Sequence, residues 1–452
     1  MISAAPRADA RAERRSLDRE IRRLAVPAFL ALIAEPTYLL ADAAIIGHLG
    51  TGPLAGLGIA GAILQTIVGL CIFLAYGTTA AVARLLGAGD LRGALGQGMD
   101  GVWLAVAIGS VATLGGLAAL GPLVGAFGAE AATEAYARDY LVWALPGVIP
   151  LLVVLAGTGV LRGLQDTRTP LYVAVGGNLL NIVLSLVLVH GVGLGIAGAA
   201  IGTVIAQTLA ATALVVVVVR AARREGARLA PHPRGIARAA RVGTPLLIRT
   251  LTLRAALLIT TVVATGAGTT SLAAHQLAMT LWGLLAFALD AVAIAAQAIT
   301  GRALGAGESA YARRITRRMV RWGVWSGLAT GLLLAAVAPV IGPAFSRDPA
   351  VHAALVPVLL VAALGQPVAG VVFVLDGVLI GAGDGTYLAW AGLVVLLAFA
   401  PLAWLSPGLP LPELVALWAV FVLVLMGGRA VVLLLRARGD AWMRTGPAST
   451  RS

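Results

Sequence analysis

A series of long apolar segments, repeated from Leu24 to Leu435, constrains the fold of this chain more than any other feature. Each is close to or above the roughly 20 residues that a helix needs to cross about 30 Å of hydrocarbon. The runs are continuously apolar, as in "LLLAAVAPVIG" (332–342), rather than alternating like the strands of a membrane barrel. Because 60% of the 452 residues are hydrophobic and only 12% are charged, a soluble globular fold is excluded. The sequence predicts an all-α integral membrane protein.

Twelve membrane spans are expected along the chain. Their predicted bounds are 24–48, 54–83, 96–127, 139–161, 170–190, 193–219, 242–266, 271–301, 322–344, 350–381, 386–405 and 411–435. The sequence contains no lysine, so arginine carries the net charge of +13, and the arginines gather at both termini and in every second loop. By the positive-inside rule, both termini are cytoplasmic, which requires an even number of spans. Since the arginines are spread over short loops without interleaved aromatic residues, we expect them to face lipid headgroups rather than nucleic acid.

The sequence repeats itself once. "ARLLGAGD" (83–90) returns as "GRALGAGE" (301–308), and "GVLRGLQD" (159–166) returns as "GVLIGAGD" (377–384); 301 minus 83 and 377 minus 159 are both 218. Each half holds six helices, an even number, so both halves enter from the same side and form a parallel repeat about a pseudo-twofold axis along the membrane normal. Two such lobes, rocking so that a cleft opens to alternate sides, have the architecture of a secondary transporter.

The repeat also predicts how the chain is divided. The expected parts are a basic cytoplasmic N-terminal segment (1–23), an N-lobe of helices 1–6 (24–219), a cytoplasmic linker (220–241), a C-lobe of helices 7–12 (242–435) and a cytoplasmic C-terminal tail (436–452). The sequence has no GxxxxGK[ST] pattern, which disfavours ATP-driven pumping within this chain. The arginine-only, Ala- and Gly-rich composition is typical of a GC-rich bacterial genome, so we expect the bacterial inner membrane.

An acid, Asp42, lies inside the first apolar segment, in "EPTYLLADAAIIGHLG" (35–50). An ionised carboxylate in hydrocarbon is costly, so it faces the protein interior and marks a pathway by default. Glu35 and Tyr38 share its helix face. At 1.5 Å per residue, the polar side chains of spans five and six reach a similar depth, and we expect them to enclose one small cavity with Asp42; they are Asn178, Asn181, Ser185 and Thr203. Structural hydrogen bonds between helices are the alternative for these side chains.

The C-lobe carries polar residues of its own within the predicted spans. They are Arg249, Arg254, His275, Gln276, Asp290 and Asp376. Of these, Asp376, Asp290, Arg254 and Gln276 are candidates for substrate binding or coupling, although Arg254 and Asp290 could simply neutralise each other. At the shift of 218, Asp42 corresponds to Thr260, so the acid of the N-lobe is not duplicated.

These polar residues lie in segments that resemble the multidrug and toxic compound extrusion (MATE) family, in the branch named for the DNA-damage-inducible protein F. The most specific segments are "EPTYLLADAAIIGHLGTGPLAGLGIA", "GNLLNIVLS", "LAAHQLAMTLWGLLAFALDAVAIAAQAITGRALGAGE" and "FVLDGVLIGAGD". The resemblance implies a two-lobe antiporter that expels organic, often cationic and amphipathic compounds in exchange for H+ or Na+. By position, Asp42 matches the coupling acid of the family, Tyr38, Asn181 and Thr203 match residues around it, and Asp376 matches a C-lobe acid used in some branches.

One residue departs from the family pattern. A second N-lobe Asp commonly stands where this chain has Ser185. A single carboxylate offers less charge to a dehydrated Na+, so we predict H+ coupling through Asp42, with Na+ coupling as the alternative. We expect no cofactor beyond the ion gradient and no metal. The expected partners are small organic substrates and the lipid bilayer, without nucleic acid, and the expected state is a monomer.

Two other functions are compatible with this pattern. A lipid-linked oligosaccharide flippase has the same broad shape, but it should line its cleft with several cations for a pyrophosphate, and only Arg249 and Arg254 are candidates. A membrane-embedded enzyme would need convergent acid, base or metal groups, and the five histidines are scattered along the chain. We therefore expect a transporter rather than an enzyme.

Overall fold

The computed structural model describes residues 5–446, with side chains at 15–34 and 36–446. Within this range the chain forms helices and short turns and no strand. The helices are α1 (Ala5–Gly47), α2 (Thr51–Cys71), α3 (Phe73–Gly87), α4 (Leu91–Ala118), α5 (Leu120–Gly125), α6 (Ala131–Ala144), α7 (Val148–Gly163), α8 (Arg168–Leu186), α9 (Gly195–Arg224), α10 (Pro233–Gly266), α11 (Thr269–Gly305), α12 (Ser309–Phe345), α13 (Pro349–Gly381), α14 (Gly385–Leu405), α15 (Glu413–Val420) and α16 (Gly427–Arg438).

Twelve segments in the described range are long and apolar enough to cross a membrane, which confirms the predicted number. Some spans join two helices through a short turn, for example α6 and α7 into Ala131–Gly163 and α15 and α16 into Glu413–Arg438. The side chains of 1–14, including Arg11 and Arg14, and the tail from 447 lie outside the described residues.

The chain forms two compact units, whose boundaries fall inside helices. One, here called the N-unit, holds residues 30–247; the other, the C-unit, holds residues 248–446 and α1 through Phe29. The lobes expected from the sequence were 24–219 and 242–435, so the structure assigns the start of α1 to the C-unit and the linker with the start of α10 to the N-unit. Direct side-chain contacts account for both reassignments.

The start of α1 is held by ion pairs within the C-unit. Asp18 accepts hydrogen bonds from Arg318 Nε at 2.7 Å and from Trp322 Nε1 at 2.8 Å. Glu20 pairs with Arg302 and accepts a hydrogen bond of 2.6 Å from the hydroxyl of Tyr311. These charge-assisted contacts anchor the N-terminal part of α1 on α11 and α12.

The linker packs on α4 of the N-unit. Trp103 Nε1 donates to the carbonyl of Leu229 at 2.9 Å, and Arg228 lies 3.4 Å from buried Asp100. Ala227 and Leu229 also contact the apolar side chain of Leu95. The linker is therefore a packed part of this unit, despite its dense Arg, Pro and Gly composition.

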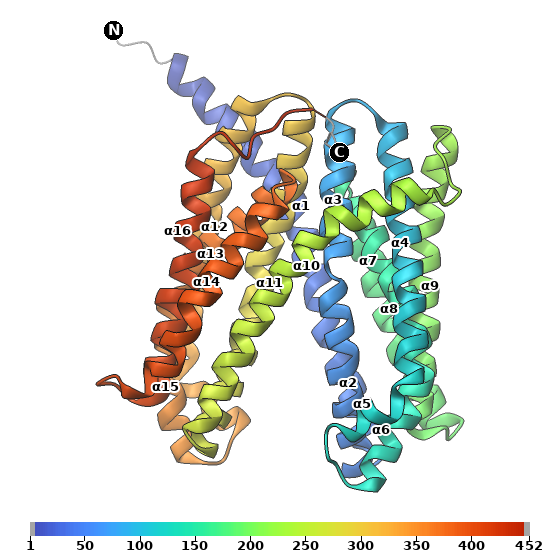
Figure 1. The fold of residues 1–452 in the computed structure, drawn as a ribbon, viewed down its shortest axis with the longest axis vertical. Coiled ribbons are helices and arrows are strands. Elements are labelled where there is room, and N and C mark those ends of the chain that lie inside the picture. Colours follow the sequence, from blue (N-terminus) through green and yellow to red (C-terminus); the bar gives the residue numbers. More distant parts are fainter. Residues whose placement is uncertain (1–4, 447–452) are drawn as a thin grey trace. The chain divides into compact units, whose positions relative to one another are not determined.

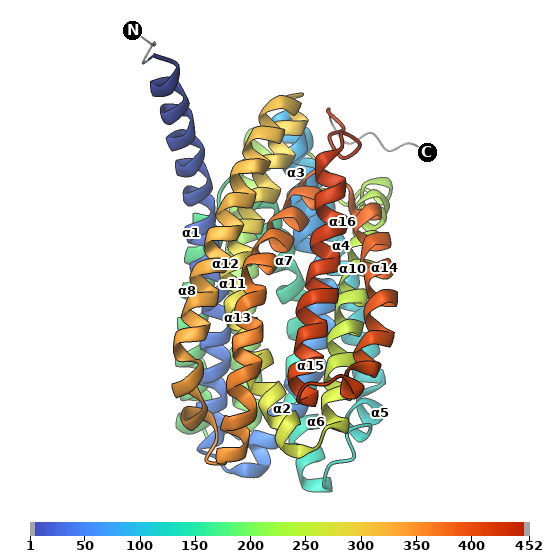
Figure 2. The ribbon, with the colours of Figure 1, turned by 90° about the vertical axis from the view of Figure 1, so that its left-hand side faces the viewer.

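The internal repeat is visible in the helix bounds. Spans Thr51–Gly87, Ala131–Gly163 and Gly195–Arg224 have counterparts that start at 269, 349 and 413; 269 minus 51, 349 minus 131 and 413 minus 195 are all 218. In the N-unit the central helix is α7, which contacts α2, α3, α4, α8 and α9 (Figure 1). In the C-unit α13 has the same place, beside α11 and α12 (Figure 2) and in contact with α14, α15 and α16.

Glycines explain how these central helices approach their neighbours. A Cβ at Gly159 of α7 would stand 2.7 Å from the carbonyl oxygen of Ala75, and one at Gly163 would stand 2.9 Å from that of Thr79. In the C-unit, Gly377 and Gly381 face the carbonyl oxygens of Ala293 and Gln297 in the same way. All four contacts obey the shift of 218. The repeated "GVLRG" and "GVLIG" are thus close-packing motifs, in which small residues let two membrane helices touch.

Candidate functional site

The carboxylate of Asp42 lies in the interior of the N-unit, with 3% of the residue exposed. Asp42 is on α1, near the end of the helix at Gly47. The hydroxyl of Ser185 on α8 donates to Asp42 Oδ1 at 3.0 Å, and the hydroxyl of Thr203 on α9 makes a longer contact of 3.5 Å with Oδ2. Three helices thus meet at one acid, and both hydrogen-bond donors described for it are neutral.

A second layer of polar side chains surrounds this contact. Asn181 Nδ2 donates to Thr203 Oγ1 at 2.8 Å, which leaves the single proton of Thr203 to point towards Asp42. Tyr140 of α6 is buried and lies beside Thr203, within electrostatic range of Asp42. Asn181 Oδ1 is buried, and no hydrogen-bond partner for it occurs among the described residues. The site therefore offers several oxygen atoms around one carboxylate.

The structure brings together Asp42, Asn181, Ser185 and Thr203, as the helix register suggested. Asn178 instead donates to the backbone carbonyl of Ala34 at 2.7 Å and so ties α8 to α1. Tyr38 is partly buried, and it is not free of interactions with other residues. The side chain of Glu35 lies outside the described residues, so its expected role stays a prediction.

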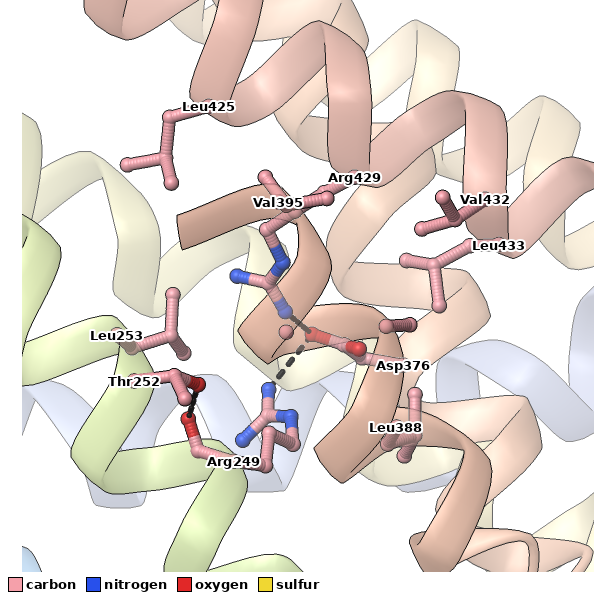
Figure 3. A pocket seen from close by; sticks show the side chains of 12 residues that line it. Arg249, Thr252, Leu253, Asp376, Leu388, Val395, Leu425, Arg429, Val432 and Leu433 are labelled. Carbon is pink, nitrogen blue, oxygen red and sulfur yellow. Dashed lines mark hydrogen bonds and ion pairs between the residues drawn. The ribbon is translucent and has the colours of Figure 1, made fainter. Parts of the chain in front are cut away.

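Asp376 forms a second buried charged cluster, inside the C-unit. Arg249 Nη2 of α10 donates to Asp376 Oδ2 at 2.6 Å, and Arg429 Nη2 of α16 donates to the same oxygen. The two guanidinium groups approach the carboxylate of α13 from two sides (Figure 3). Because two cations already hold Asp376, this acid is poorly placed to bind a cationic substrate or Na+ in this conformation.

The cluster lines a cavity of about 20 Å³, enough for one water-sized group. Thr252 supplies the one other polar side chain of the lining, and its hydroxyl donates to the backbone carbonyl of Arg249 at 2.8 Å. The remaining lining is apolar and consists of Leu253, Leu388, Ala391, Gly392, Val395, Leu425, Val432 and Leu433. Two arginines and one aspartate give this pocket a formal charge of +1.

The other C-lobe candidates do not line this pocket. Arg254 and Gln276 are exposed, and Asp290 is partly buried. His275 is fully buried, where its Nδ1 accepts a hydrogen bond of 3.3 Å from Trp418 Nε1. The four candidates named for the C-lobe are therefore not one site.

Sequence reasoning did not select Arg429 or Tyr140. Arg429 is the one charge inside the apolar run "LVLMGGRAVVLLL" (423–435), which is a signal that could have identified it. Tyr140 stands in "DYLVWALPG" (139–147), where nothing distinguishes it from a packing residue. Its place beside Thr203 depends on how α6 is rotated against α9.

Comparison with known proteins decides the family. The MatE family model matches residues 27–187 and 245–405, which together are more than half of the chain. The chain belongs to the MATE family. The two matched segments are displaced from each other by 218 residues, since 245 minus 27 and 405 minus 187 are both 218. Each lobe of this MATE protein therefore carries one copy of the family's repeat.

Known relatives and a solved structure agree with this assignment. Protein DETOXIFICATION 44, chloroplastic, of Arabidopsis thaliana is 31% identical over 95% of this MATE chain and 83% of its own length. DNA damage-inducible protein F of Escherichia coli K12, after which the expected branch is named, is 28% identical over 66% of each chain. The bent form of the Vibrio cholerae MATE transporter VcmN has the same fold, with a TM-score of 0.87, 22% identity and coverage of 95% of this chain and 99% of its own. The protein is a multi-pass membrane transporter and not an enzyme.

Proposed function

We propose that this MATE transporter exports organic compounds, many of them cationic and amphipathic, in exchange for H+ that binds Asp42. The observation that carries the proposal is the environment of this acid: it is 3% exposed and is held by neutral hydroxyl groups. A charged carboxylate in such surroundings is costly, so a bound proton is the simplest way to neutralise it.

Proton binding would change the hydrogen bonds that join three helices. A protonated Asp42 can donate as well as accept, so it no longer depends on the donors at Ser185 and Thr203 in the same way. Because these residues come from α1, α8 and α9, a change at the carboxyl group would alter how the helices pack. We infer that alternating access is driven by this rearrangement, with the proton taken up on one side of the membrane and released on the other.

Na+ coupling is the second candidate, and one observation favours it. The buried Asn181 Oδ1, with no hydrogen-bond partner among the described residues, adds an uncharged oxygen beside Asp42, Ser185 and Thr203. Oxygen ligands of this kind suit a hard cation. The single carboxylate makes H+ the first choice, and the experiment below separates the two ions.

We propose a bacterial inner membrane as the location, with both termini in the cytoplasm and the protein acting as a monomer. The arginine-rich alternate loops support this orientation through the positive-inside rule. The relative in Escherichia coli supports a bacterial source.

Uptake of an ethidium-like cation into inverted membrane vesicles tests the coupling. A pH gradient alone should drive uptake by the parent protein, and Asp42→Asn should lower the rate by about tenfold or more, because the titrating group is gone. Asp100→Asn is the matched control, since Asp100 is also buried in the N-unit, at 4% exposure, but pairs with Arg228 of the linker. Undiminished pH-driven uptake by Asp42→Asn would refute proton coupling at this residue, and uptake driven by a Na+ gradient alone would favour the second candidate.

A further inference from the structure

The helix that carries Asp42 contains a proline six residues before the acid. Pro36 has no N–H, so it cannot donate to the carbonyl oxygen of Leu32 as a residue in a regular helix would. Membrane helices tolerate such a proline where side chains or a neighbouring helix supply hydrogen-bond donors close by. One donor here is local, because the hydroxyl of Thr37 donates to the carbonyl of Ile33 at 2.9 Å. The other donor comes from α8.

Helix α8 holds α1 on both sides of this proline. On one side, Asn178 Nδ2 donates to the backbone carbonyl of Ala34 at 2.7 Å. On the other side, the hydroxyl of Ser185 donates to Asp42 Oδ1 at 3.0 Å. Asn178 and Ser185 are seven residues apart, which is about two turns, so they lie on the same face of α8. The first bond joins two uncharged groups, whereas the second involves the carboxylate that we propose gains and loses the proton.

The other copy of the repeat lacks this arrangement. At the shift of 218, Pro36 corresponds to Arg254 and Asn178 corresponds to Leu396. The C-unit therefore has neither the proline nor the amide at these positions. The two occur together in the copy that carries Asp42, so the scaffold that both units share does not require them.

A fixed point before the proline matters for the geometry at the acid. A helix bends most readily at a proline, so the segment of α1 beyond it can rest in more than one position against α8. The amide of Asn178 holds the turn at Ala34, on the other side of the proline from the acid. We therefore expect it to restrict Asp42 to the position in which the hydroxyls of Ser185 and Thr203 reach it. Because both hydroxyls donate to the carboxylate, they favour its ionised form.

We propose that Asn178 is a positioning residue for proton coupling, whose amide holds α1 at Ala34 so that Asp42 meets its hydroxyl donors. The proposal rests on the proposed binding of H+ by Asp42, and it adds a residue that acts on the acid through the backbone of α1. Asn178 itself does not titrate. Among the described residues, the titratable side chains near Asp42 are those of Tyr140 on α6, within electrostatic range, and Tyr38 on the same face of α1. Its hydrogen-bond partners from α8 and α9 are neutral hydroxyls.

The H+ dependence of transport reports the surroundings of Asp42. Uptake of an ethidium-like cation into inverted vesicles is recorded at several luminal pH values, which gives the luminal H+ concentration for the half-maximal rate. Asn178→Leu removes the amide and introduces the residue of the other copy. This H+ concentration should fall by about threefold to tenfold, because a carboxylate that has moved away from its hydroxyl donors holds H+ more tightly. Asn178→Gln keeps an amide donor and should shift it less.

Thr113→Val is the matched control in the same unit. The hydroxyl of Thr113 on α4 donates to the backbone carbonyl of Leu145 at 2.9 Å, so this variant also removes a hydrogen bond from a side chain to a carbonyl of another segment. Neither residue belongs to α1 or α8. The H+ dependence should stay at the parent value, even where the thermal unfolding midpoint falls as far as in Asn178→Leu. The comparison separates positioning of the acid from a general loss of stability.

Two results would overturn the proposal. One is a parent-like H+ dependence in Asn178→Leu, and the other is an equal shift in Thr113→Val. Should Asn178→Leu fail to fold, Asn178→Ala gives the same comparison without the added apolar bulk. Asp42→Asn is measured beside these variants. If it loses pH-driven uptake while Asn178→Leu keeps the parent H+ dependence, the positioning role alone fails, whereas full pH-driven uptake by Asp42→Asn means that the proposed coupling has failed.

Discussion

Single residues show that much of the repeated sequence serves turn geometry rather than transport. Gly89 and Gly307, the last glycines of the two "GAG" motifs, have φ values of 77° and 80° after the ends of α3 and α11. The next repeated turn has φ 74° at Gly383 but φ 68° at Gln165, which is the one residue other than glycine with positive φ in the described chain. This conformation costs a residue with a side chain about 1–2 kcal/mol. The turn is therefore strained at Gln165 in the N-unit and relaxed at Gly383 in the C-unit.

Substitutions at Gly383 and Gln165 should therefore change the stability of the protein in opposite directions. We expect Gly383→Ala to destabilise the protein by about 1 kcal/mol, since alanine disfavours positive φ. Gln165→Gly should stabilise it by about 0.5 kcal/mol through relief of the same strain. The measurement is the midpoint of thermal unfolding of the purified protein, and shifts of the same sign would contradict this account.

At the scale of the element, the central helices α7 and α13 are placed by glycine contacts. Gly381 approaches the backbone carbonyl of Gln297 on α11 so closely that a methyl group has no room, as Gly163 does with Thr79 on α3. Around Gly283, also on α11, no neighbouring helix or side chain of the described residues comes within 4 Å of where a methyl group would stand. The two kinds of glycine look alike in the sequence, and only their neighbours distinguish them.

Alanine at these glycines should separate packing from helix propensity. Gly381→Ala should destabilise the fold by about 1–3 kcal/mol, because α13 must move away from α11. Gly283→Ala should be neutral or stabilising by up to about 1 kcal/mol, since alanine favours a helix and meets open space. The yield of monodisperse protein and its unfolding midpoint report both effects; equal losses for the two variants would argue against the close contact.

Across the whole molecule, the two copies of the repeat carry their polar sites at different positions. The residues that form the polar site of one unit correspond, at the shift of 218, to uncharged and mostly apolar residues in the other unit. At the shift of 218, Asp42 corresponds to Thr260, while Tyr140, Asn181, Ser185 and Thr203 correspond to Val358, Phe399, Ala403 and Phe421. These four C-unit residues are at most 1% exposed and belong to one hydrophobic core. One copy of the repeat carries the acid and its hydroxyl partners, and the other carries packed apolar side chains at the positions that correspond to those partners.

The two units should therefore not be interchangeable in coupling. Thr260→Asp buries an acid at a position that is 1% exposed, and the repeat counterparts of the side chains around Asp42 are apolar, so we expect a destabilisation of about 3 kcal/mol or more. Combined with Asp42→Asn, it should not restore pH-driven uptake. Thr260→Val is the control, because it keeps the shape of the side chain and should leave uptake near the parent level. Recovery of uptake in the double variant would show that the C-unit can take over proton binding.

The amino-acid sequence by itself determined the number of membrane spans, the repeat of 218 residues and the polar groups around Asp42. It did so because hydrophobic length, local spacing and depth along a helix are encoded within each segment. Tertiary structure alone decided that Asp376 meets Arg249 and Arg429, that Tyr140 reaches Thr203, and that the boundaries of the units fall inside α1 and α10. These features depend on how almost uniformly apolar helices are rotated against one another, and a uniformly apolar surface carries little information about which face turns inward.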